Sequence, residues 1–203
     1  MTGIMQAILG GETKAPAGSN IYTTPGTYSF TVPFGVRSLT CTVIGGGGGG
    51  GGLWNPGDAW SGAGGGSGGY YSNTAVTVSP GQVLTITVGA GGLGGSGLAT
   101  GTWFACSGLG NTFLGQAGGS SSVGSLLVAG GGGAGGNPLN GESAGAGGSP
   151  NGTAGQGGVV NCLTPLYGGS NGTGYGAGGE GGNCVNTGYC AASGGNGYIS
   201  IAW

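Results

Sequence analysis

Short stretches in which apolar and polar residues alternate recur along the chain, and this period of two is typical of half-buried β-strands. The clearest examples are residues 28–32 and 39–43, where every second residue is apolar. The pattern predicts six short strands that share one small antiparallel β-sandwich, an all-β fold with no substantial α-helix. Pro80 followed by Gly81 predicts a type II turn between two of the strands. The strands are expected within residues 27–44, 74–88, 125–129 and 198–203.

Glycine fills most of the chain between these strands. It supplies 62 of the 203 residues, including eight in a row at 45–52, and later runs such as Gly130, Gly133 and Gly136 have glycine at every third position. A polyglycine-II helix has three residues per turn and no internal hydrogen bonds, so helices with this spacing approach closely and bond to one another. Collagen is excluded because the register slips and there are only eight prolines. The glycine-rich excursions, about 45–73, 89–124 and 130–197, are therefore predicted to form a polyglycine-II bundle.

The chain has few charged residues, which argues against nucleic acid as a partner. Only 3% of residues are charged, and Lys14 and Arg37 are the only basic ones, too few to bind nucleic acid. No apolar stretch is long enough for a membrane span, and residues 1–10 lack the basic start of a signal peptide, so neither membrane insertion nor export is expected. The mean hydropathy of +0.17 argues against intrinsic disorder.

No pattern of catalytic residues emerges. The chain has no histidine, and its four acids are far apart in the sequence, so neither acid–base nor nucleophilic catalysis is supported. Matches to G-x-G-x-x-G carry no information in so glycine-rich a chain. We expect no enzyme activity, no cofactor and no metal site.

Five cysteines are present without CxxC spacing. They are interpreted as buried or neutral thiols, with a disulfide between Cys184 and Cys190 as the alternative. Asn151-Gly152-Thr153 matches the glycosylation pattern, but asparagine before glycine is equally typical of a tight turn, which we favour here.

The inserts between glycine runs carry three of the four tryptophans and several other aromatic residues. Such residues either cap the ends of the glycine helices or form a contact surface, because tryptophan and tyrosine dominate binding hot spots on rigidly presented loops. The candidate receptor-binding residues are Trp54, Trp60, Trp103, Phe104, Tyr167 and Tyr189.

An ordered series of motifs carries a resemblance to a known family. The motifs are YSFTVPFGV at 28–36, VIGGGG at 43–48, VSPGQ at 78–82, TVGAGG at 87–92 and GYISI at 197–201. Over residues 20–203 the chain resembles the glycine-rich domain of bacteriophage tail-fibre and tail-tip proteins, and the helix bundle is similar to the adhesins of T-even-type tail fibres. Residues 2–6 resemble the start of some phage tail proteins, and residues 1–19 are expected to be a leader or docking segment.

This resemblance implies a non-enzymatic virion protein, made in the host cytoplasm, that binds other phage tail proteins and a bacterial surface protein or glycan. It implies either a homotrimer or a single chain mounted on a trimeric fibre. The alternative function is a purely structural tail or capsid component whose inserts pack on neighbouring subunits. Ice binding by a flat face of glycine helices is disfavoured because the helices lack regular threonine or alanine ranks.

Overall fold

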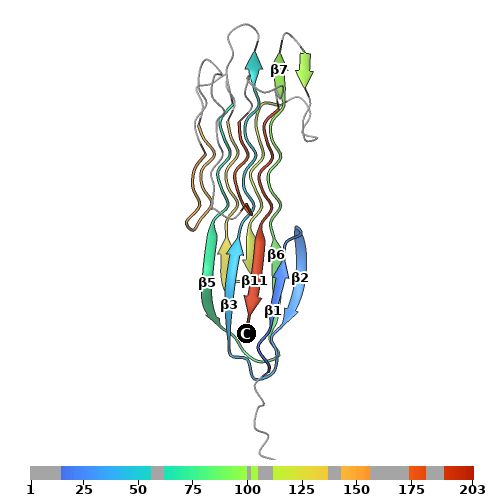
Figure 1. The fold of residues 1–203 in the computed structure, drawn as a ribbon, viewed down its shortest axis with the longest axis vertical. Helices are drawn as coiled ribbons and strands as arrows, with labels where there is room; N and C mark the ends of the chain where they lie inside the picture. The colour runs from blue at the N-terminus through green and yellow to red at the C-terminus, as the bar shows by residue number, and fades with distance from the viewer. Residues whose placement is uncertain are drawn as a thin grey trace, which may run out of the picture.

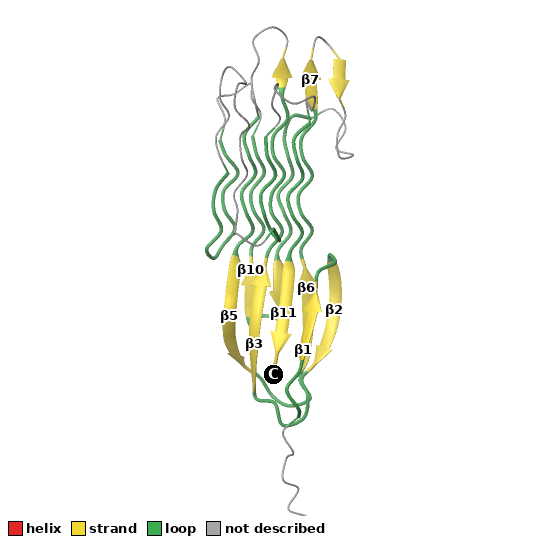
Figure 2. Cartoon of the chain, in the orientation of Figure 1, coloured by secondary structure: helices red, strands yellow, loops and turns green. Residues whose placement is uncertain are grey.

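The chain is elongated, with a β-sandwich at one end, straight glycine-rich segments in the middle and a small sheet at the other end (Figures 1 and 2). A computed structural model describes residues 15–55, 62–99, 102–104, 112–136, 143–155, 174–181 and 190–203. These residues contain strands and no helix, which confirms the predicted all-β class. None of them forms a helix with the length and hydropathy needed to cross a membrane.

Two four-stranded antiparallel sheets form the sandwich. The first sheet has the order β1 (Ser19–Tyr22), β11 (Tyr198–Ala202), β3 (Ser38–Ile44) and β5 (Tyr70–Thr77). The second has the order β10 (Leu127–Ala129), β9 (Ser121–Val123), β6 (Val83–Val88) and β2 (Gly26–Thr31).

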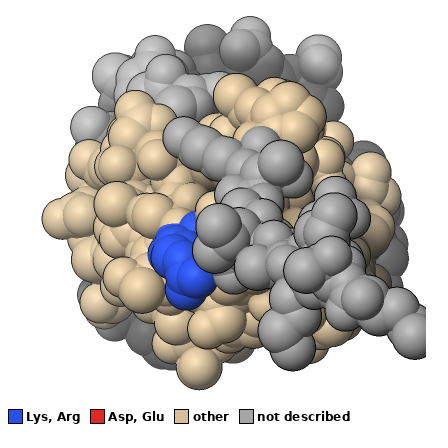
Figure 3. Space-filling model, turned by 90° about the horizontal axis from the view of Figure 1, so that it is seen from below, with Lys and Arg blue, Asp and Glu red and all other residues tan. Residues whose placement is uncertain are grey.

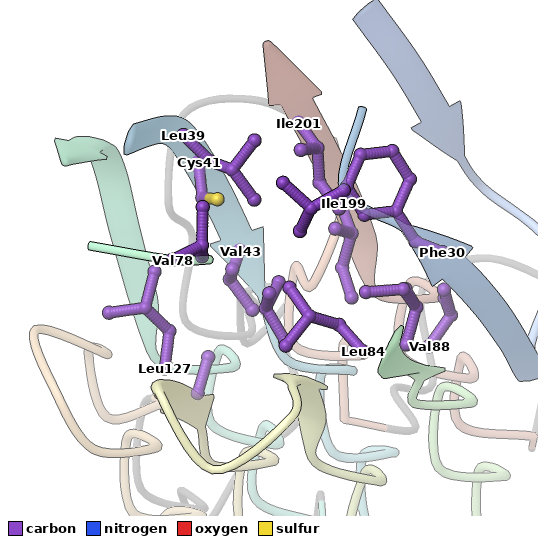
Figure 4. Packing of buried hydrophobic residues seen from close by; sticks show 14 of the residues in the cluster. Phe30, Leu39, Cys41, Val43, Val78, Leu84, Val88, Leu127, Ile199 and Ile201 are labelled. Atoms are coloured by element: carbon purple, nitrogen blue, oxygen red, sulfur yellow. The ribbon is translucent and has the colours of Figure 1, made fainter. Parts of the chain in front are cut away.

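Alternation along the strands builds the core between the two sheets. Leu39, Cys41 and Val43 of β3 are fully buried, whereas Ser38 and Thr40 face solvent. Ile199 and Ile201 of β11 are fully buried in the same cluster and point toward residues of the opposite sheet (Figure 4). Burial of one such side chain contributes about 1.5–3 kcal/mol, so this core is the conventional hydrophobic anchor of the molecule.

The sandwich has two strands more than the six that the alternation predicts. β1 was missed because it is an edge strand whose residues are mostly exposed, so no apolar period marks it. β9 was missed because Ser121 occupies a buried position, where its hydroxyl accepts a hydrogen bond from the Gly89 N–H at 3.0 Å. The strand expected at 125–129 is shorter, because residues 124–126 form the turn between β9 and β10.

The turns predicted around Gly81 and Asn151 are present. Gly81 has φ of 77°, and the N–H of Gln82 donates to the Ser79 carbonyl at 3.0 Å, as a type II turn requires. Asn151 has φ of 62° and its side-chain amide donates to the Tyr70 carbonyl at 3.1 Å, which confirms the turn interpretation there. The similar sequence at 171–173 lies outside the described residues.

The glycine-rich segments continue from the sandwich as straight rods (Figure 1). We number them in chain order as rod 1 (45–52), rod 2 (62–69), rod 3 (89–96), rod 4 (112–119), rod 5 (130–136), rod 6 (143–149), rod 7 (152–155), rod 8 (176–181) and rod 9 (190–197). Hydrogen bonds between rods repeat every three residues, the repeat of polyglycine II.

Among the described rods, rod 1 lies at the centre of a ring of six others. The N–H groups of Gly48, Gly49 and Gly50 donate to rods 2, 4 and 9, at 2.8, 2.8 and 3.0 Å. Rods 3, 5 and 8 run in the same direction as rod 1 and donate to its carbonyl oxygens. Hydrogen bonds between neighbouring rods close the ring in the order 2, 5, 4, 3, 9, 8. Rods that run in the direction of rod 1 therefore alternate with rods that run in the opposite direction. Rods 6 and 7 pack outside this ring: rod 6 bonds to rods 2 and 5, and rod 7 bonds to rods 2 and 6.

This central position explains the eight consecutive glycines. A Cβ atom on Gly48 would overlap a carbonyl oxygen of rod 5, one on Gly49 would overlap rod 3, and one on Gly50 would overlap rod 8. The same three directions recur over all of residues 45–52. Because every direction is occupied by backbone, no position in rod 1 tolerates a side chain.

Side chains appear where the ring meets solvent. Ala90, Gln116 and Ala192 are exposed on rods 3, 4 and 9. On the outer side of rod 3, side-chain oxygens replace a missing rod: Asn196 accepts a hydrogen bond from the Gly91 N–H at 3.0 Å. The lattice thus ends in polar side chains that satisfy its outermost backbone donors.

Candidate functional site at the far end of the rods

A three-stranded sheet lies at the end of the rods farthest from the sandwich, which we call the distal end (Figure 2). Its strands, in spatial order, are β4 (Trp54–Asn55), β7 (Gly97–Ala99) and β8 (Thr102–Phe104). β4 is the direct continuation of rod 1, and β7 is the direct continuation of rod 3. Since those rods are parallel neighbours, β4 and β7 pair in parallel, while β8 turns back antiparallel to β7.

The register of this sheet brings together two of the predicted aromatic residues. Trp54 pairs with Leu98 across β4 and β7, and Leu98 pairs with Trp103 across β7 and β8. Trp54 and Trp103 therefore occupy one row with Leu98 between them, although 48 residues lie between them in the sequence. Phe104 pairs with Gly97 in an adjacent row.

The remaining predicted site residues are not placed. Trp60, Tyr167, Tyr189 and Cys184 lie outside the described residues. The flanks of the segment 182–189 are placed, however: Gly181 approaches Gly62, and the Ala191 N–H donates to Gly95 at 3.1 Å. The described residues that flank that segment thus lie at the distal end.

Buried apolar side chains lie on the rods next to the distal sheet. Leu53, the last residue before β4, is fully buried, and Ala63, Phe113 and Ala191 on the surrounding rods are buried too. Gly52 donates to the Phe113 carbonyl at 2.7 Å, which ties rod 1 to rod 4 at this level. These residues were not singled out from the sequence. A leucine directly after a glycine run was the available signal, and it marks the change from close backbone packing to side-chain packing.

The two cysteines within the described residues differ: the thiol interpretation is confirmed for Cys41 and wrong for Cys190. Cys41 is a free thiol in the sandwich core, and burial raises its pKa from 9.0 to about 11, so it stays protonated at neutral pH. Cys190, at the distal end of rod 9, is disulfide-bonded. Its partner is not among the described residues, because Cys41 is the only other cysteine there. Pairing with Cys184 remains a prediction.

No group of three or more histidine, cysteine, aspartate or glutamate side chains gathers anywhere in the described residues. Glu180 on rod 8 is exposed and is the one acid within the described ranges. The described part of the distal end contains a strand pairing whose residues include Trp54, Trp103 and Phe104.

Comparison with protein families gives one match. The model of a family described as a glycine-rich domain matches residues 23–203, nearly the whole chain. The chain belongs to this family. The matched range of the glycine-rich domain includes the sandwich from β2 onward, the rods and the distal sheet. A search among curated proteins finds no significant match.

Proposed function

We propose that this glycine-rich domain is a non-enzymatic phage virion protein at a tail fibre or tail tip, where it binds a host receptor through its distal inserts. The observation that carries the proposal is the row of Trp54, Leu98 and Trp103 at the end opposite the sandwich. The family match over residues 23–203 lies within the range of the sequence resemblance to phage tail proteins and is compatible with it.

The rods supply what a receptor-binding surface needs. Rod 1 has eight residues, which at about 3.1 Å per residue places the distal sheet roughly 25 Å beyond the sandwich. Its hydrogen bonds to neighbouring rods hold the ends of β4 and β7 in place before any partner arrives. Aromatic residues presented on such a support lose little conformational entropy on binding. The proposed receptor is a bacterial surface protein or glycan.

The test is a double variant, Trp54→Ala with Trp103→Ala. The purified variant is expected to lose binding to cells of the host bacterium, and to lose the ability to compete with phage for adsorption. Tyr175→Ala is the matched control, because Tyr175 is a partly exposed aromatic at the sandwich end of rod 8, where it stacks on Tyr198. Denaturation midpoints establish that each variant is folded.

Cell binding that survives the double substitution would contradict the assignment of the site. Wild-type protein that is present in virions but binds no host cells and does not compete with phage would instead favour the purely structural alternative, in which the inserts pack on neighbouring subunits. Cell binding thus tests the receptor as a partner, and presence in virions tests the tail proteins as partners.

A further inference from the structure

Basic residues are confined to the first part of the chain. Lys14 and Arg37 are the only two, so residues 38–203, which supply every rod and every insert, contain no lysine, arginine or histidine. The same range contains three acids, which give it a formal net charge of −3: Asp58, Glu142 and Glu180. Because the whole range lacks basic residues, no insert can present a cationic side chain, whatever its conformation.

The placed charges agree with this division. β3 runs toward the rods, so Arg37, which directly precedes it, lies at the end of the molecule opposite the distal sheet, which we call the proximal end. The view of the described residues from below shows this one basic side chain and no acidic one (Figure 3). Glu180, exposed on rod 8, is the one charged side chain within the described parts of the rods and the distal sheet.

An anionic receptor is therefore poorly matched to the distal end. Proteins recognise phosphate and carboxylate groups chiefly with arginine, lysine or the N-terminus of a helix. The chain has no basic residue after Arg37, and the described residues form no helix. The net charge of −3 over residues 38–203 also repels an anionic surface.

A typical protein epitope is poorly matched for a related reason. A standard interface takes about 20–30 residues from each partner, and about a quarter of the residues in an average protein are charged. About five to eight charged groups would then be covered, roughly half of them acidic. Each covered acid would lose its water without gaining a cationic partner, which costs binding free energy.

A neutral glycan avoids this cost and suits the residue types of the distal sheet. A sugar ring has apolar C–H faces and hydroxyl groups at its rim. β4 consists of Trp54 and Asn55, and β8 includes Thr102 and Trp103. Amide and hydroxyl groups can both donate and accept hydrogen bonds, and tryptophan adds apolar area with one N–H donor.

We infer that the receptor bound at the distal end is an uncharged glycan of the bacterial surface, one without phosphate, carboxylate or amino groups. This inference rests on the proposed function and names the chemical class of its receptor. Binding of such a glycan releases no counterions, so its affinity should be nearly independent of salt, whereas cationic contacts to phosphates weaken steeply as salt rises.

The test measures binding of the purified wild-type protein to host cells after two treatments. Sodium periodate, which cleaves the vicinal diols of sugars, should lower the affinity by about tenfold or more, a loss of about 1.4 kcal/mol or more. Proteinase K, which removes exposed surface protein, should leave it unchanged. On untreated cells, raising sodium chloride from about 50 to about 500 mM should change the affinity by less than about threefold.

Glu180→Gln is the matched variant for charge, because it removes the exposed acid of rod 8 and keeps the size of the side chain. It should bind as the wild type does, and weaker binding would show that the receptor carries a cationic group, which would overturn the inference. Binding that survives periodate, is abolished by proteinase K, or falls about tenfold with salt would also overturn it and leave the receptor proposal intact. Wild-type protein that binds no untreated host cells would refute the proposed function itself.

Discussion

Replacement of Gly48 by alanine tests whether close packing of backbone is what the central rod requires. Gly48 lies in the middle of rod 1, and an added Cβ would overlap the carbonyl oxygen of Gly133 on rod 5. Its N–H donates to Gly66 on rod 2 at 2.8 Å, and its carbonyl accepts from Gly179 on rod 8 at 2.7 Å. The methyl group collides with main chain, so no change of rotamer relieves the contact.

Gly48→Ala changes the free energy of unfolding in three ways. Forcing extra volume into a packed interior costs about 1–3 kcal/mol. Rod 5 donates hydrogen bonds to the carbonyl oxygens of Gly46 and Gly49, on either side of Gly48. Separation of rods 1 and 5 weakens these two bonds, each contributing about 1 kcal/mol. Against this, alanine is easier to order than glycine by about 0.5–1 kcal/mol. The free energy of unfolding should therefore fall by about 2–4 kcal/mol.

Equilibrium denaturation by guanidinium chloride measures this difference. Gly119→Ala is the control, because Gly119 lies on rod 4 of the ring and the nearest atom to its added Cβ is the Ala90 nitrogen at 3.1 Å. That contact is tight but not an overlap, so the control should lose less than about 1 kcal/mol. If Gly48→Ala costs no more than Gly119→Ala, overlap between rods is not the reason for the octaglycine.

Two further predictions concern buried side chains at the two ends of the rods. Leu53→Ala should lower the free energy of unfolding by about 2–5 kcal/mol, because Leu53 is fully buried beneath the distal sheet; a cost under about 1 kcal/mol would show that the site is loosely packed. Burial raises the pKa of Cys41 from 9.0 to about 11 in the folded protein. The contribution of this thiol to the free energy of unfolding is therefore intact below pH 9 and is lost as the pH rises toward 11, because the unfolded thiol ionises first. Relative to Cys41→Ala, wild-type stability should fall over that range by up to about 2–3 kcal/mol, and parallel pH profiles would contradict the assignment.

Local patterns predicted the strands that have one face on the core and one in water. Residues 28–32 and 39–43 alternate clearly, and they coincide largely with β2 and β3. The three-residue glycine repeat likewise predicted polyglycine II, because it depends on backbone geometry alone. β1 escaped prediction because an exposed edge strand needs no apolar period. β9 escaped because a buried serine breaks the period.

The position of each rod in the lattice was not predictable from local sequence. Rod 1 contacts segments as distant as rod 9, and one glycine looks like another in the sequence, so nothing local says which neighbour it faces. The geometry of the candidate site was not predictable from local sequence for the same reason. Trp54 and Trp103 were both singled out, but their placement in one row depends on rods 1 and 3 being parallel neighbours, which is a property of the whole lattice.

The order of the lattice can nevertheless be traced to the sandwich. In the first sheet β3 lies between β11 and β5, and rod 1, which continues β3, lies beside rods 9 and 2, which join those two strands. In the second sheet the order β10, β9, β6 is repeated as rods 5, 4 and 3. β10 contacts both β3 and β5, as rod 5 bonds to rods 1 and 2.

Rod 8 is the one member of the ring with no strand beneath it among the described residues. It begins at the turn of residues 174–176, where Tyr175 stacks on Tyr198 of β11. The hydrophobic sandwich core thus fixes strand order, and strand order fixes which glycine rods meet. The arrangement of β4 and β7 at the distal end follows from packing at the other end of the molecule, so substitutions that reorder the sandwich should displace the distal site without touching it.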